Sequence, residues 1–266
     1  MRELEDVVKA LSILKKYVDQ IESKDPQLKA IKKVVQRHGL ASLGVVVGNA
    51  LVSYRLKGTG EEYWTEFGEF FSSHEPTVEN LIKFIKKSRY NVALKEQKVR
   101  RVERVKEFLE RVSANPLRYK DLDALRQELA RVLGAKGTEK TVVFASKMAY
   151  YAFKAAGVEA EGDVPVPVDS RVATVTCASG LVEGTVEEIM GAKRDEAVRT
   201  WARAAREAGM KTLNLDAVIW LPARGLRRAL CRGVEAGREL FASNLKGLGV
   251  EEAEEVSALL IKKACC

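Results

Sequence analysis

Histidine and cysteine are scarce in this chain of 266 residues, which holds two histidines and four cysteines. They are His38, His74, Cys177, Cys231, Cys265 and Cys266. No two cysteines have the C-x-x-C spacing of a zinc or redox site, so we expect neither a metal site of these residue types nor a cofactor. We interpret the thiols, including the adjacent pair at 265 and 266, as reduced and the compartment as reducing and cytosolic.

Long apolar runs are also missing from the sequence. No stretch of about 18 uncharged apolar residues occurs, which excludes a transmembrane helix. The first residues, MRELEDVV, are charged and amphipathic, whereas a secretory signal needs an apolar stretch there. We therefore expect a cytoplasmic protein with no membrane partner.

Charge is unbalanced toward the basic side. Lys and Arg number 45 against 37 Asp and Glu, which gives a net charge of +8 and a pI near 9.2. This excess favours anionic partners, because neutralising phosphates releases condensed counterions. Charge alone does not decide between a nucleic-acid partner and another one.

Apolar residues recur at helical spacing along most of the chain, and strand alternation is hard to find. The first stripe consists of Leu4, Val7, Leu11, Leu14, Val18 and Ile21. It stops near Pro26, which cannot continue a helix. Further helices are predicted over 27–37, 43–56, 94–112, 122–132 and 138–155, and from about residues 76, 170, 185, 195, 215 and 251. Residues 163–168 contain two prolines and are predicted to be an extended linker. The predicted fold class is all-α.

The region 122–173 carries the most specific pattern. Its helix 122–132 leads into a tight connection, Leu133-Gly134-Ala135-Lys136-Gly137, and the next helix has Lys140 in its first turn. Such a hairpin can point backbone N–H groups at a DNA phosphate without a competing side chain. A lysine at a helix N-terminus lies in positive potential, which disfavours its protonated form. If it is also desolvated, its neutral fraction can act as a nucleophile.

An aspartate follows the extended segment. Asp169 comes directly after Pro-Val-Pro-Val and before Ser-Arg-Val-Ala, so we expect it to cap a helix. Considered separately, Lys140 would be interpreted as a solvated surface lysine and Asp169 as a structural helix cap. Their order, hairpin then lysine then extended segment then aspartate, favours a catalytic pair instead.

This order resembles the helix–hairpin–helix superfamily of DNA glycosylases, and its details resemble the archaeal GO glycosylase family, which acts on 8-oxoguanine. The usual hairpin is Gly-x-Gly with the lysine two residues later, whereas here it is Gly134-x-x-Gly137 with Lys140 three beyond, and the Lys-to-Asp spacing is longer. Further similar segments lie at 25–27, 34–39, 49–56, 60–64, 140–144 and 215–220. The likeness spans about residues 20–225. The four spaced cysteines of the superfamily's iron–sulfur branch are missing.

The resemblance implies a monomeric, two-lobed helical bundle with a helix–hairpin–helix motif and the active site in the cleft between lobes. One lobe is expected over 28–155 and the other over 1–27 and 156–266. The implied enzyme is an 8-oxoguanine DNA N-glycosylase and lyase that works on nucleoid DNA by base excision repair. The implied catalytic residues are Lys140 and Asp169. The implied base pocket is Gln27, Trp64, Phe144, Lys147, Asp216 and Trp220, and the implied DNA-backbone contacts are Gly134, Lys136 and Gly137.

The chemistry of the lesion suits these residue types. Phe144 and Trp220 offer flat surfaces for a flipped base, and the two oxygens of Asp216 match the N1–H and amino donors of a guanine edge. The amide oxygen of Gln27 would accept from N7–H, which exists only in the lesion. Lys86, Lys87, Arg89 and residues 100–104 are candidate basic flanks.

Two alternatives remain at this point. A related lyase for oxidised pyrimidines would share Lys140 and Asp169, although the carboxylate of Asp216 suits guanine better than a thymine edge. A non-catalytic helical nucleic-acid-binding protein would have an unreactive Lys140. Trapping of a covalent adduct distinguishes the enzymes from the binding protein.

Overall fold

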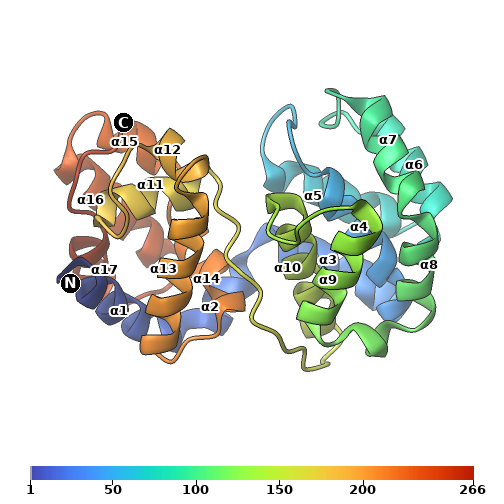
Figure 1. The fold of residues 1–266 in the computed structure, drawn as a ribbon, viewed down its shortest axis with the longest axis horizontal. Helices are drawn as coiled ribbons and strands as arrows, with labels where there is room; N and C mark the ends of the chain where they lie inside the picture. The colour runs from blue at the N-terminus through green and yellow to red at the C-terminus, as the bar shows by residue number, and fades with distance from the viewer. Residues whose placement is uncertain (1) are drawn as a thin grey trace. The chain divides into compact units, whose positions relative to one another are not determined.

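The computed structural model describes residues 2–266, and within that range every regular element is helical (Figure 1). The only strand-like pairing in this range is one isolated parallel bridge between Asp121 and Glu161. The predicted all-α fold is confirmed. The chain divides into two compact units, of which one combines residues 1–25 with 165–266 and the other comprises residues 26–164. We refer to them as unit 1 and unit 2.

Unit 1 packs its helices around Trp201 and Phe241, both of which are fully buried. Its N-terminal helix α1 lies against α13 and α17, although these are far apart in sequence. The elements are α1 (Arg2–Leu14), η1 (Lys15–Tyr17), α2 (Val18–Lys24), α11 (Ser170–Ser179), α12 (Val186–Met190), α13 (Arg194–Glu207), α14 (Thr212–Leu215), the π-helical η4 (Asp216–Trp220), α15 (Leu226–Leu230), α16 (Val234–Gly247) and α17 (Ala253–Leu260).

Unit 2 is built around α4, whose ten residues are all buried, and α10, which packs on α3, α4 and α9. Helices α3 and α5 approach so closely that a Cβ on Gly68 would lie 3.0 Å from the backbone of Ala30. The elements are α3 (Pro26–His38), η2 (Gly39–Ser42), α4 (Leu43–Val52), α5 (Gly60–Phe71), α6 (Val78–Lys87), α7 (Lys95–Arg104), α8 (Lys106–Ala114), η3 (Pro116–Tyr119), α9 (Leu122–Leu133) and α10 (Lys140–Ala155).

Several helix boundaries differ from the predicted ones. The first predicted stripe is interrupted by a 3-10 turn at 15–17, and the segment 94–112 divides into α7 and α8 at Val105. Helix α4 ends at Val52, four residues early, and α6 begins after the cap Thr77 rather than at Pro76. Apolar spacing alone does not report such boundaries, because helix ends depend on backbone hydrogen bonds and caps as well as on apolar residues.

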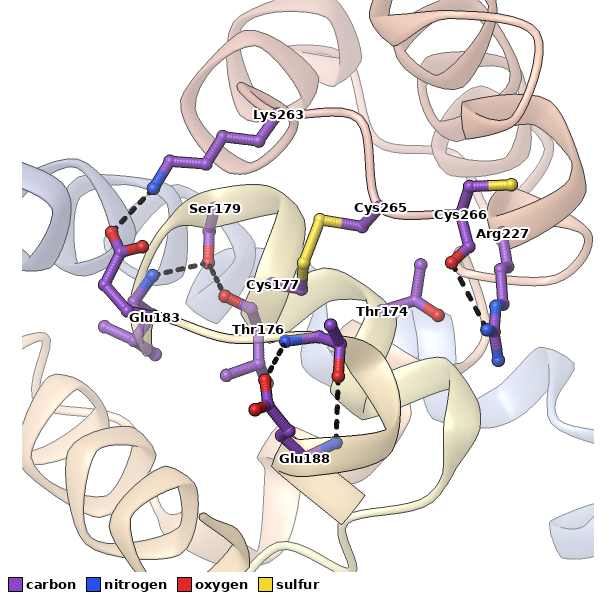
Figure 2. The surroundings of a disulfide bond; sticks show 12 residues. Thr174, Thr176, Cys177, Ser179, Glu183, Glu188, Arg227, Lys263, Cys265 and Cys266 are labelled. Carbon is purple, nitrogen blue, oxygen red and sulfur yellow. Dashed lines mark hydrogen bonds and ion pairs between the residues drawn. A yellow bond between two sulfur atoms is a disulfide. The ribbon is translucent and has the colours of Figure 1, made fainter. Parts of the chain in front are cut away.

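The four cysteines form two disulfides, Cys177–Cys265 and Cys231–Cys266, so the expectation of reduced thiols is wrong. The reason is a long-range fold-back that spacing does not reveal. After α17 the chain returns along α11, where Lys262 N and Lys263 N donate to the carbonyl of Ala178 at 2.8 and 3.0 Å. This pairing brings Cys265 to Cys177 (Figure 2).

In the range 2–266, no helix is long and apolar enough to cross a membrane, as the sequence predicts.

Candidate active site

The hairpin between α9 and α10 is built from local backbone interactions. Gly134 ends α9 in the left-handed conformation, with φ of 64°, and Ala135 N donates to the carbonyl of Ala130 at 2.8 Å. Gly137 also has a positive φ of 85°, and Arg126 Nη1 donates to its carbonyl at 2.8 Å. Both glycines are required, because larger residues are strained at such angles.

The hairpin N–H groups do meet a competing side chain, contrary to the sequence hypothesis. Glu139 accepts from Lys136 N through one carboxylate oxygen and from Gly137 N through the other, each at 2.8 Å. The signal that could have revealed this is an acidic residue two positions beyond the second glycine, within reach of the turn. The N–H groups of Lys136 and Gly137, which were predicted to contact the DNA backbone, therefore donate to the protein's own carboxylate at Glu139.

Lys140 is the first residue of α10, and its side chain is exposed. Arg101 of α7 donates through Nη2 to Thr141 Oγ1 at 2.7 Å, so a second cation lies beside this first turn. The desolvation that the sequence hypothesis invoked for Lys140 is thus not provided by the protein alone.

The four pocket residues predicted in unit 2 lie on the neighbouring helices α3, α5 and α10, and two of them, Trp64 and Phe144, are in contact. Gln27 stands in the first turn of α3, and its amide lies beside the start of α5, since a Cβ on Gly60 would be 3.7 Å from its Nε2. Trp64 of α5 is fully buried and meets the ring of Phe144 of α10 edge-on, with ring centroids 6.2 Å apart. Gln27, Trp64, Phe144 and Lys147 thus lie on three helices that pack on one another.

Two of these residues have unusual surroundings. The Trp64 indole N–H is buried and has no hydrogen-bond acceptor within the described chain. Lys147 is 2% exposed, and its ammonium lies 4.8 Å from the ring centre of Tyr150 and 4.5 Å from that of Tyr151. Aromatic rings attract a nearby cation through their quadrupoles, so these two rings help to fix the position of the Lys147 ammonium.

Asp169 is the N-cap of α11, as predicted. Its Oδ1 accepts from Arg171 N at 2.9 Å and from Val172 N at 3.1 Å. Its Oδ2 accepts from the indole N–H of Trp220 at 2.7 Å. One carboxylate therefore anchors the helix and accepts from a residue that the sequence predicts to lie in the base pocket.

Asp216 and Trp220 are the first and last residues of η4, a π-helical turn that follows α14. Asp216 is buried, whereas Trp220 is half-buried. Such π-turns are rare and occur often at functional sites. Sequence periodicity did not predict this one, because a 3.6-residue repeat describes α-helices only.

Arg171 is a residue that the sequence analysis did not single out. Its guanidinium lies 3.9 Å from the ring centre of Trp220, so the cation covers one face of the indole. Its position two residues after the predicted cap was the available signal. Asp169, Arg171 and Trp220 form one cluster, which we call the carboxylate cluster of unit 1.

Fold and site together define a helix–hairpin–helix protein in which a lysine opens the second helix. A model of the N-glycosylase/DNA lyase family, AGOG, matches residues 8–257. The chain belongs to this family.

Known relatives agree with this assignment. An N-glycosylase/DNA lyase of Pyrobaculum aerophilum is 33% identical over 254 residues, covering 93% of this chain and 89% of the relative. One from Methanopyrus kandleri is 32% identical, covering 80% and 84%. Among solved structures, 8-oxoguanine DNA glycosylase from Pyrobaculum aerophilum, complexed with 8-oxoguanosine, matches with a TM-score of 0.75 and 30% identity over 90% of this chain and 95% of that one.

Proposed function

We propose that this protein excises 8-oxoguanine from DNA and then cleaves the strand, with Lys140 as nucleophile. The observation that carries the proposal is the exposed position of Lys140 directly after the hairpin, in a chain of the N-glycosylase/DNA lyase family. The solved relative binds 8-oxoguanosine, which supports the choice of base.

The pocket residues supply groups complementary to this base. Phe144 and the half-buried indole of Trp220 offer stacking surfaces, and Asp216 accepts from N1–H and the amino group. The Gln27 amide oxygen accepts from N7–H. The buried N–H of Trp64, which lacks a protein acceptor in the described chain, suits the oxygen that the lesion carries at C8. A normal guanine leaves the Gln27 amide oxygen and the Trp64 N–H unpaired, at a penalty of about 1–3 kcal/mol each.

Excision exchanges one bond for another at C1′ of the deoxyribose. The neutral amine of Lys140 attacks C1′, the bond from C1′ to N9 breaks, and its electron pair leaves with the base. The proton lost by the amine balances the one gained by the departing base. Asp169 stabilises the positive charge that develops at C1′. DNA seated on the hairpin buries Lys140 and thereby provides the desolvation that the free protein lacks.

Strand cleavage follows from the same covalent link. Opening of the sugar ring turns the C1′–N bond into a protonated Schiff base, which acidifies the C2′ protons. Removal of one of these protons forms the C2′–C3′ double bond, and the C3′–O bond breaks with the phosphate as leaving group. The strand is thus cut on the 3′ side of the lesion, and water releases Lys140.

The setting of this activity is part of the proposal. The enzyme acts as a monomer on nucleoid DNA, without a cofactor, in the cytoplasm. Two disulfides do not argue against the cell interior, because intracellular proteins of hyperthermophiles often carry them. The phosphate backbone is the partner of the hairpin, with Arg101 and Arg104 of α7 beside it.

Borohydride trapping tests the proposal. Wild type and Lys140→Gln are incubated with duplexes that carry 8-oxoguanine, dihydrouracil or no lesion, and covalent adducts are counted. We expect an adduct only with wild type and only on 8-oxoguanine. An adduct on dihydrouracil alone assigns the enzyme to oxidised pyrimidines. Bound DNA without any adduct makes the protein a non-catalytic binder.

A further inference from the structure

The carboxylate of Glu139 occupies the two backbone donors of the hairpin that are expected to hold DNA. Its two oxygens take one N–H each, from Lys136 and Gly137. Lys136 is exposed, so the bond from its N–H lies at the surface, where a nucleic-acid backbone can reach it, whereas Gly137 is buried and its bond to Glu139 is partly covered. The contact involves no distant element, because donors and acceptor belong to four consecutive residues.

The surroundings of these donors are those of an anion site. Two adjacent backbone N–H groups that converge on one point bind carboxylates and phosphates alike. Two cations flank the hairpin, since Arg126 donates to the carbonyl of Gly137 and a Cβ on Gly134 would lie 3.5 Å from Arg104 Nη2. Arg126 is also paired with Asp123 at 3.0 Å, so the cation of this site that adds positive charge is Arg104, and the carboxylate of Glu139 accepts from both backbone donors.

Glu139 is not needed as a helix cap in the usual way. It stands at the N-cap position of α10, where a side chain typically accepts from the next turn of the helix, yet its side chain makes no such bond. The carboxylate turns back to the hairpin instead. A capping role therefore does not explain this geometry, whereas occupation of the anion site does.

We propose that Glu139 is an internal competitor of the DNA phosphate, which leaves the hairpin donors when the backbone binds. This inference rests on the proposed function, because it assumes that the hairpin holds DNA. A phosphate oxygen and a carboxylate oxygen cannot use the same N–H at full strength, and their charges repel. The exchange weakens binding to every sequence alike, so undamaged DNA, which lacks the pocket contacts, is released faster.

The test is the affinity for an undamaged duplex, which requires no catalysis. Glu139→Ala and Glu139→Gln are compared with Glu107→Ala, which removes one exposed negative charge of the same unit, on α8. We expect Glu139→Ala to bind about 5–30-fold more tightly than the control variant, with Glu139→Gln in between. The slope of log affinity against log salt should steepen by about one unit, because one more phosphate is neutralised.

Affinity in Glu139→Ala equal to that of Glu107→Ala overturns the proposal, provided that the melting temperature is unchanged. If the hairpin of the variant does not fold, the exchange is tested on the wild-type protein by NMR. The ¹³C resonance of its Glu139 carboxylate should shift on saturation with the duplex, and an unshifted resonance overturns the exchange. If the wild-type protein binds no DNA, the proposed function fails together with the inference about Glu139. If the wild-type protein binds DNA but Glu139→Ala shows no gain in affinity, only the inference about Glu139 fails.

Discussion

Trp220 donates its indole N–H to Asp169 Oδ2 at 2.7 Å, across 51 positions of sequence. The ring proposed to stack on the base thus also holds the carboxylate proposed to assist the chemistry. Arg171 covers the other side of this ring, so the indole has little freedom to turn. The proposed function therefore implies that recognition of the base and placement of the carboxylate are coupled through one side chain.

Trp220→Phe should slow excision while leaving a ring for stacking. A hydrogen bond to a charged group is worth about 1.5–3 kcal/mol, so we expect single-turnover excision of 8-oxoguanine to fall by roughly 10–100-fold. The matched control is Trp201→Phe, since Trp201 donates to Thr176 Oγ1 at 2.8 Å in the same unit. That variant should lose stability but keep its excision rate. Equal rates in wild type and Trp220→Phe would mean that the bond is only structural.

Asp169→Asn separates the cap of α11 from the chemistry. The amide oxygen can still accept from Arg171 N and Val172 N, whereas the amide nitrogen cannot accept from Trp220. We expect excision to fall by roughly 10²–10⁴-fold, with a melting temperature close to that of Trp220→Phe, because both changes remove the same hydrogen bond. Asp169→Ala should lose a further increment of stability, about 1 kcal/mol, with the cap. A variant that unfolds, or one that excises at the wild-type rate, contradicts the catalytic role.

Loss of the disulfides should lower thermal stability. They close loops with sequence separations of 88 and 35, for which the chain-entropy model gives about 3–5 kcal/mol each. Removing either one should reduce the melting temperature by roughly 5–15 °C. A reductant should act on wild type but not on the double variant Cys265→Ser/Cys266→Ser. Four titratable thiols in denatured, unreduced wild type would show that neither bond forms.

Lys98 should make stability depend on alkaline pH. It is buried and donates to the Tyr54 carbonyl at 2.6 Å, and burial lowers its pKa to about 8 from the ordinary 10.5. The penalty for holding this amine charged is fully present below pH 8. It is relieved between pH 8 and 10.5, where the unfolded chain binds a proton that the folded chain does not. The melting temperature of wild type minus that of Lys98→Met should therefore increase from pH 7 to pH 10, and a flat or falling difference contradicts this.

Local patterns predicted much of the fold and part of the site. The helix period gave most segments, and Pro-Val-Pro-Val followed by Asp169 gave both the extended linker and the cap of α11, because these depend on neighbouring residues. The chain turns at Gly134 and Gly137 for the same reason, since few residues other than glycine adopt positive φ.

What escaped prediction depends on contacts between distant residues or on side-chain reach. The disulfide from Cys177 to Cys265 follows from a fold-back that no spacing encodes. Trp220 meets Asp169 only because η4 packs on α11. Glu139 was overlooked because a carboxylate of its length can face solvent, cap a helix or return to the turn. Which of these three positions the Glu139 side chain adopts depends on the backbone conformation of the hairpin, which the sequence pattern does not reveal.

Unit 2 interrupts unit 1 in the chain, and this order has a consequence during biosynthesis. Helix α1 is synthesised before unit 2, but its buried residues Val7, Leu11 and Leu14 belong to a helix that packs on α17, which is synthesised after unit 2. At ordinary elongation rates the delay is on the order of tens of seconds. During that time unit 2 can complete its own core while the apolar stripe of α1 stays unburied.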